Sequence, residues 1–182
     1  MGAPIPHHFL VHPNANALVA QWRALCEDPL IQALPHKVET NQRGQLLMSP
    51  ARNRHSLLQA ALAARLTRLA QLHGIRGAAA TECAIVTSDG VKVPDVVWMS
   101  GEPVAASLIT DVVDAAPPVC IEVLSPSNSE REMQEKAALY FAADTEEVWL
   151  CATNGAMRFL GQSRELTASA PFPDFPRTLE IG

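Results

Sequence analysis

The sequence contains no uninterrupted run of apolar residues that approaches the roughly 20 needed to cross a bilayer. Its first residues, MGAPIPHHFLVHP, lack the basic and apolar blocks of a signal peptide. From these two absences we expect a protein that makes no membrane contact and that stays in the cytoplasm. The sequence also has no internal repeat.

Cysteine is scarce, and its spacing is irregular. The four cysteines, Cys26, Cys83, Cys120 and Cys151, form no C-x-x-C pair, and three of them lie inside apolar, strand-like runs. This pattern predicts buried, reduced thiols.

Basic residues are too few for a general nucleic-acid-binding surface. The formal net charge is -5, whereas neutralising phosphates requires clustered Lys and Arg. Carboxylates gathered around bound metal ions would invert the local sign, so the charge does not exclude such a substrate. With 48% hydrophobic and 18% charged residues over 182 positions, the composition indicates one folded domain.

Hydrophobic spacing predicts two helices in the first half of the chain. Residues 15–27 place Leu18 and Trp22 at helical spacing, and Asp28 with Pro29 ends the pattern. Residues 51–73 carry a leucine stripe with arginines on the other side, and a glycine follows as a stop signal. Between these helices, residues 37–50 predict two short strands around a Gly44 turn.

The second half shows two hairpin signals and one buried strand. Ser88-Asp89-Gly90 separates the apolar runs 77–87 and 91–99, and Thr153-Asn154-Gly155 separates 146–151 from 157–160. Residues 117–124, PPVCIEVL, predict a strand covered on both faces, and 125–144 predict a helix. A short helix around 104–109 is a further possibility.

Together these elements predict a single α/β domain, residues 1–182, with a mixed central sheet flanked by helices. We expect an extended leader over residues 1–13 and an irregular C-terminal tail over 161–182.

One acid interrupts each of two apolar strands. Glu122 lies at the centre of its run, and Asp95 is the only acid in VKVPDVVWM. A buried carboxylate without a partner costs several kcal/mol, so each acid needs a cation, a metal ion or a proton, or else lies at a strand end in water. Two lone acids on adjacent strands repel unless a hard cation lies between them, and Mg²⁺ or Mn²⁺ suits such oxygen ligands.

The helix after the Glu122 strand carries a lysine near its inward face. Ser127 with Glu130, or Ser129 with Glu132, makes a capping box at the helix start. Lys136 then falls at the margin of the inward stripe formed by Met133, Ala137, Tyr140 and Phe141.

Lys136 can therefore lean towards the sheet, or it can form a surface i,i+4 pair with Glu132. The chain has eleven Arg and only three Lys residues, so a surface position would more often hold Arg. The compact ammonium of lysine can approach a nucleophilic water molecule more closely than the guanidinium of arginine can.

The segments VPDVVWM and PPVCIEVLSPSNSEREMQEKAALYFAADTEEVWL resemble the restriction endonuclease family of the Uma-two type, within the PD-(D/E)XK nuclease superfamily. LCEDPLIQALPHKVETNQRGQLLMSPARNRHSLLQAAL is similar to the opening of that family, so the resemblance covers about residues 18–160. It implies a restriction-endonuclease-like fold and a metal-dependent nuclease that hydrolyses phosphodiester bonds.

The resemblance implies roles for individual residues. Asp95 and Glu122 match the two metal-binding acids, and the Val123 carbonyl would join them. The superfamily pattern asks for lysine two residues after Glu122, where this chain has Leu124. Lys136 matches the place to which this family moves that lysine.

Four further residues are implied less directly. Glu39 resembles an additional metal-binding acid of the family, and His55 is a possible accessory residue. On the arginine-bearing helix, Arg52 and Arg54 could contact nucleic-acid phosphates, although the sequence favours a solvated face.

The implied cofactor is Mg²⁺ or Mn²⁺, and the implied partners are nucleic acid, with DNA favoured over RNA, and a second copy in a homodimer. Two alternatives stay open. One is a catalytically inactive, nuclease-like binding or regulatory module, and the other is a metal-dependent hydrolase of a different substrate.

Overall fold

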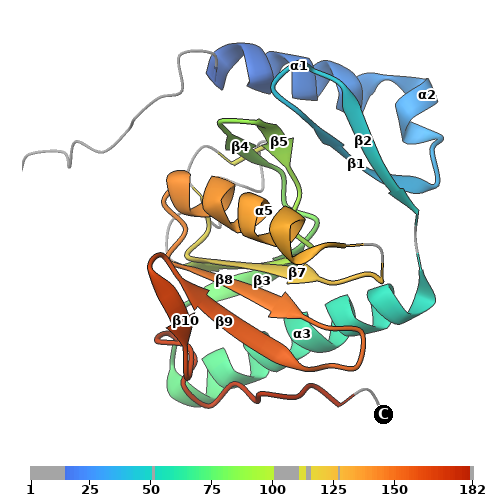
Figure 1. Ribbon diagram of the computed structural model, residues 1–182. Helices are drawn as coiled ribbons and strands as arrows, with labels where there is room; N and C mark the ends of the chain where they lie inside the picture. Colours follow the sequence, from blue (N-terminus) through green and yellow to red (C-terminus); the bar gives the residue numbers. More distant parts are fainter. Residues whose placement is uncertain (1–14, 51, 101–110, 114–115, 127, 181–182) are drawn as a thin grey trace, which may run out of the picture.

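A six-stranded sheet forms the centre of the molecule, in the order β10-β9-β8-β7-β6-β3 (Figure 1). The structure, a computed structural model, describes residues 15–50, 52–100, 111–113, 116–126 and 128–180. β7 and β8 run parallel, and the other neighbouring pairs are antiparallel, which confirms the expected mixed sheet. The strands are β3 (Gly77–Thr81), β6 (Val96–Ser100), β7 (Val119–Val123), β8 (Glu147–Cys151), β9 (Met157–Gly161) and β10 (Arg164–Leu166).

Two helices cover the two faces of this sheet (Figure 1). Helix α3 (Asn53–His73) packs its leucine stripe, Leu58, Leu62, Leu66 and Leu69, against one face. Helix α5 (Glu130–Ala142) packs Met133, Ala137 and Tyr140 against the other. β7 is buried along its whole length because both of its faces are covered.

The helix ends follow from local sequence. Gly74 ends α3 with a φ of 65°, a left-handed conformation that glycine adopts without strain. Ser129 accepts a hydrogen bond from the Glu132 backbone, and the Glu132 side chain returns to the Ser129 N–H, so one of the two expected capping boxes forms. Ser127 lies outside the described residues.

The remaining elements lie above the α5 side of the sheet (Figure 1). Hairpin β1–β2 is a separate two-stranded sheet, and β4–β5 is another. Trp22 of α1 packs near Val91 of β5 in a third apolar cluster. These elements are α1 (Ala15–Glu27), α2 (Pro29–Gln32), β1 (His36–Thr40), β2 (Leu46–Pro50), β4 (Ile85–Thr87) and β5 (Gly90–Lys92).

Several local predictions need correction. The hairpin predicted around Asp89 forms as β4–β5, but each apolar run is divided between two strands, and β3 and β6 pair within the main sheet. Cys26 is exposed and Cys83 half-buried, because they lie on α1 and in the loop after β3; all four cysteines are free, as expected. The possible helix at 104–109 and the leader 1–13 lie outside the described residues.

The C-terminal segment differs most from expectation. Residues 164–166 form β10, and residues 167–180 contain no helix or strand, as expected, but Phe172, Phe175 and Leu179 are buried in the core on the α3 side. The Phe175 ring lies 4.6 Å from that of Trp149, and the Phe172 ring lies 5.1 Å from that of Trp98, measured between centroids. Aromatic contacts rather than backbone pairing hold most of this segment.

No helix in the described part of the chain is both long and apolar enough to cross a membrane.

Replacing Phe172 with alanine should destabilise the protein, because the ring is 1% exposed and packs edge-on against two tryptophans. We expect the free energy of unfolding to fall by about 3–5 kcal/mol, measured by urea denaturation. Leu72→Ala is the control, since Leu72 is 73% exposed and should change little. A decrease below about 1 kcal/mol in Phe172→Ala would mean that the segment is not part of the core.

Candidate functional site

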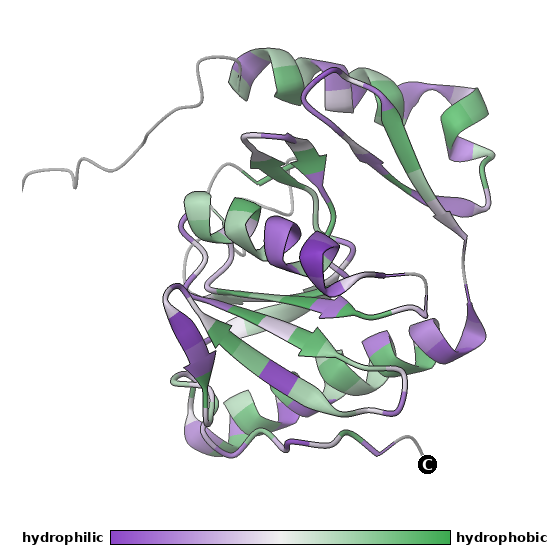
Figure 2. Cartoon of the chain, in the orientation of Figure 1, coloured by the Kyte–Doolittle hydropathy of each residue, from purple (hydrophilic) through white to green (hydrophobic). Residues whose placement is uncertain are grey.

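A cleft of about 680 Å³ opens between the β1–β2 hairpin, the end of β7 and the first turns of α3 and α5. Seven Asp or Glu side chains line it, against four Lys or Arg side chains. The N-terminal half of α5, next to this cleft, is hydrophilic, whereas its C-terminal half is apolar (Figure 2). The cleft is therefore an acidic depression on an otherwise ordinary α/β core.

Asp95 lies at the bottom of this cleft, one residue before β6, and is 1% exposed. Continuing the register of Val96 with Ile121 by one residue places Asp95 across from Glu122. The Val123 backbone N–H donates to Asp95 Oδ2 at 2.7 Å, and His55 Nε2 lies 3.0 Å from Oδ1. Neighbouring strands and α3 thus fix the carboxylate, which is not at a solvated strand end.

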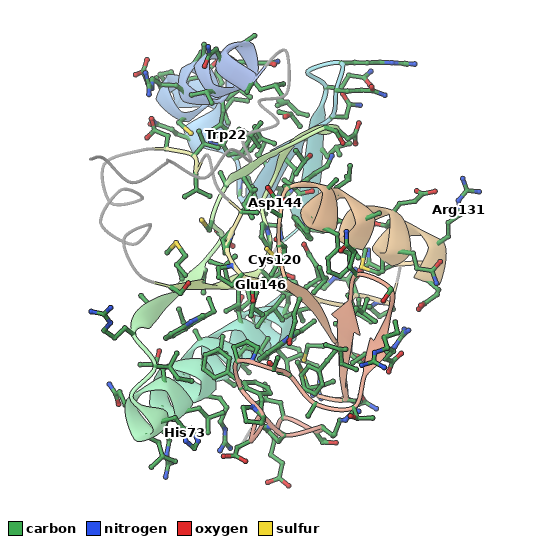
Figure 3. All side chains as sticks on the ribbon, turned by 90° about the vertical axis from the view of Figure 1, so that its left-hand side faces the viewer. Trp22, His73, Cys120, Arg131, Asp144 and Glu146 are labelled. Atoms are coloured by element: carbon green, nitrogen blue, oxygen red, sulfur yellow. The ribbon has the colours of Figure 1, made fainter. Side chains whose placement is uncertain are left out.

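Glu122 lies 5% exposed in β7 and points towards α5. Lys136 Nζ is 2.9 Å from Glu122 Oε1 and also 2.9 Å from Glu39 Oε1. Lys136 therefore leans towards the sheet, whereas Glu132, its alternative surface partner, caps the helix instead. By contrast, Arg131 on the same helix projects away from the body of the molecule (Figure 3).

Hydrogen bonds between β1 and the segment around β5 hold Glu39 near Lys136. The Val93 N–H donates to Glu39 Oε1 at 2.9 Å, so β1 is tied to the segment that follows β5. Thr40, the next residue of β1, accepts a hydrogen bond at its Oγ1 from the Val91 N–H, also at 2.9 Å. These contacts dock the C-terminal end of β1 and present the Glu39 carboxylate to the cleft.

Three residues that the sequence did not indicate as site residues contact Asp95 or Glu122. Lys37 Nζ lies 2.5 Å from Asp95 Oδ1, and Tyr140 donates its hydroxyl to Glu122 Oε1 at 2.5 Å. Gln59 Nε2 lies 3.4 Å from Asp95 Oδ1. Lys37 is two residues before Glu39, so strand alternation places both on one face of β1, and this spacing was the available signal.

Burial and charge act on these groups in opposite directions. Burial raises the pKa of Asp95, but the His55 hydrogen bond and the positive charge of Lys37 outweigh it and lower the pKa to about 2. Burial raises the pKa of Glu122 despite the opposing charge of Lys136. Burial also lowers the pKa of Lys136, but Glu122 and Glu39 reverse the effect and raise it. The cluster is a network of three acids and two lysines in a poorly solvated place.

The predicted arginines lie beside the cleft rather than in its centre. Arg52 lines the cleft and also a second, adjoining pocket of about 350 Å³, which Arg54 lines as well. Arg54 Nε donates to the Thr153 carbonyl at 2.5 Å. Leu124, in the slot of the superfamily lysine, lines this second pocket and packs at the edge of the α5-side core.

Residues 21–174 match the family described as "Putative restriction endonuclease" (Uma2). This match spans most of the chain, which therefore belongs to that family.

Five chains of solved structures also resemble this one. A protein from Anabaena variabilis, described as "a putative nuclease belonging to DUF820", shares 16% sequence identity at a TM-score of 0.64. The match covers 78% of this chain and 87% of that chain, and it supports a restriction-endonuclease-like fold. No curated protein sequence matches significantly.

The low pKa of Asp95 predicts a specific acid lability. A carboxyl whose pKa is lower in the folded than in the unfolded state stabilises the fold above the unfolded value, near 4, and that stabilisation is lost as pH falls towards about 2. Between pH 5 and pH 2.5, in EDTA, the free energy of unfolding should fall by about 2 kcal/mol more in the wild type than in Asp95→Asn.

Glu122 has a raised pKa because burial disfavours its charged form. As pH falls, Glu122 takes up a proton in the folded state first, which raises the free energy of unfolding and opposes the decrease caused by Asp95. The Asp95 charge also contributes to raising the Glu122 pKa, so the difference between the two proteins reports Asp95 together with its interaction with Glu122. Parallel pH profiles in urea denaturation would show that Asp95 is not held in its charged form.

Proposed function

We propose that this chain is a metal-dependent nuclease that hydrolyses phosphodiester bonds of nucleic acid, most readily DNA. The observation that carries the proposal is the meeting of Asp95, Glu122 and Lys136 in one cleft of a chain that belongs to a restriction endonuclease family. Aliphatic side chains at these positions would avoid the cost of burying charges, so a cluster of buried acids and a lysine at a cleft favours a functional role.

The oxygen donors of the cleft suit Mg²⁺ or Mn²⁺. Carboxylates and carbonyls are the ligands that these hard cations prefer, and the lining has an excess of acids. The described residues contain no ready-made group of three His, Cys, Asp or Glu side chains for a metal ion. The fit is therefore one of donor chemistry, and Asp95, Glu122, the Val123 carbonyl and Glu39 are the residues that would hold the ion.

A bound divalent ion would supply a water of lowered pKa and positive charge beside the phosphoryl group. The residues of the chain then position and stabilise. Asp95 is kept in place by the Val123 N–H and by His55, which acts as an accessory residue. Lys136, which stays protonated between two acids, would orient the attacking water and stabilise negative charge that develops on the phosphate.

Purified protein should cleave single- or double-stranded DNA or RNA in Mg²⁺ or Mn²⁺ and lose that activity in EDTA. Asp95→Ala and Lys136→Ala should each lower the cleavage rate about a hundredfold or more, because the first removes a proposed metal ligand and the second removes a positive charge that would stabilise the transition state.

Arg131→Ala is the matched control on α5, since the Arg131 side chain is 87% exposed and pairs only with Glu135 among the described residues. It should cleave at the wild-type rate. Cleavage that survives both Asp95→Ala and Lys136→Ala would come from another site or from a contaminant, and would refute the assignment.

The arginines at the first turn of α3 are proposed to contact substrate phosphates. Both Arg52 and Arg54 line the pocket that adjoins the cleft. Arg52→Gln with Arg54→Gln should weaken nucleic-acid binding equally for all sequences. In fluorescence anisotropy with Asp95→Ala protein, the slope of log affinity against log salt should decrease by about one for each phosphate that the variant no longer neutralises.

Arg65→Gln with Arg68→Gln removes the same charge from exposed positions further along α3, away from both pockets. If this control pair lowers the salt slope as much as the first pair, the effect comes from overall charge and the proposed phosphate contacts are refuted.

A second candidate function is a nuclease-like binding module without turnover. Its support is that Asp95, Glu122 and Glu39 already have lysine partners in the described structure. Calorimetry with Mn²⁺ on the wild type and Glu122→Gln separates the two functions. Binding that Glu122→Gln abolishes favours the nuclease, and no binding in either protein favours the module.

A homodimer is also proposed, because two cuts across a duplex suit two-fold symmetry. Sedimentation velocity on the full chain tests it, and a single monomeric species would refute it.

A further inference from the structure

We infer that the Lys37 ammonium is the resident counter-ion of Asp95 and that a divalent metal ion displaces it, so that Lys37 determines how tightly this cleft binds metal. The inference rests on the proposed metal-dependent function and adds a residue to it. It assigns Lys37 an exchange role, distinct from that of Lys136.

The geometry places Lys37 where a metal ion would compete for Asp95. Its Nζ lies 2.5 Å from Asp95 Oδ1, and the two side chains are only 15% and 1% exposed. Its charge also interacts with Glu122, so it is attracted to the same two acids that would ligate an ion. A dication and an ammonium repel each other strongly at such short range in a poorly solvated cleft, so both cannot stay on Asp95.

Lys136 is less free to leave. It contacts two carboxylates, Glu122 and Glu39, each at 2.9 Å. Its helix is capped by Ser129 and packs Met133 and Tyr140 into the core, which fixes the lysine backbone. Moving this ammonium would leave the buried Glu122 and the half-buried Glu39 without their cation.

Lys37 lies on a less constrained element. Among the described strands, β1 pairs only with β2, in a sheet separate from the central one (Figure 1). Side-chain hydrogen bonds at Glu39 and Thr40 tie β1 to the segment around β5. In the described structure Asp95 is the ion-pair partner of Lys37. Release of Lys37 therefore breaks one ion pair and leaves the docking contacts of the hairpin in place.

Asp95 does not need Lys37 to keep its orientation. The Val123 N–H holds Oδ2 at 2.7 Å, and His55 lies 3.0 Å from Oδ1. Without Lys37 the carboxylate would remain aimed into the cleft with one negative charge uncompensated. That state is ready for a divalent cation and unfavourable in its absence.

The test measures Mn²⁺ binding by calorimetry and thermal melting with and without Mn²⁺, neither of which depends on catalysis. Lys37→Met removes the competing charge and keeps most of the side-chain volume. In EDTA it should melt at a lower temperature than the wild type. It should bind Mn²⁺ about tenfold more tightly, and its melting temperature should rise more on Mn²⁺ addition.

Lys92→Met is the matched control. Lys92 is another buried lysine at the cleft, 4% exposed, but it contacts Asp89 and the Thr40 carbonyl rather than Asp95. Its removal leaves the Lys37–Asp95 pair in place but takes away one docking contact of β1, so it should lower the melting temperature and should not tighten Mn²⁺ binding. A second variant, Lys37→Arg, keeps the charge and forms a stronger, forked contact with a carboxylate, so it should bind Mn²⁺ more weakly than the wild type.

The outcomes separate this inference from the proposed function. If the wild type binds Mn²⁺ but Lys37→Met binds it equally or more weakly, the exchange role is overturned and the nuclease proposal stands. If Lys37→Met does not fold in EDTA, the decision falls to Lys37→Arg, and unchanged Mn²⁺ affinity there overturns the inference. If no variant and no wild-type protein binds Mn²⁺, the metal-dependent function itself fails.

Discussion

Burial of carboxylates at one end of the central sheet is the constraint from which the site follows. Asp95 and Glu122 are almost without solvent contact, and an ionised acid in such a place requires compensation. The fold provides it from two directions: Lys136 arrives from the helix after β7, and Lys37 from a hairpin outside the main sheet. Neighbouring strands, the crossover helix and the hairpin are therefore joined by charge as well as by apolar packing.

This constraint also explains how much of the site could be predicted from the sequence. A lone acid in an apolar strand needs a partner, which identified Asp95, Glu122 and Lys136, and the structure brings them together. Lys37 was missed because its partner, Asp95, is distant in sequence. The sequence offered one signal, the two-residue spacing that puts Lys37 on the same face of β1 as Glu39. Whether these residues bind metal or cleave a substrate stays a proposal.

The fold was predictable wherever periodicity was strong. The leucine stripe predicted α3 to within two residues, and one of the two predicted capping boxes, at Ser129, begins α5. The C-terminal segment has no such periodicity, and it is held by aromatic rings that contact Trp98 and Trp149, so no local pattern revealed its burial. Likewise, the run from 77 to 87 is continuous in composition, although it contributes strands to two different sheets.

Alternation along β7 gives Glu122 its direction. Val119, Ile121 and Val123 face the α3 core, whereas Cys120 and Glu122 face α5. Inserting or deleting a single residue in this strand would exchange the two sets, turning the acid into the leucine layer and an aliphatic side chain towards Lys136. The register between β6 and β8 therefore fixes the length of this strand.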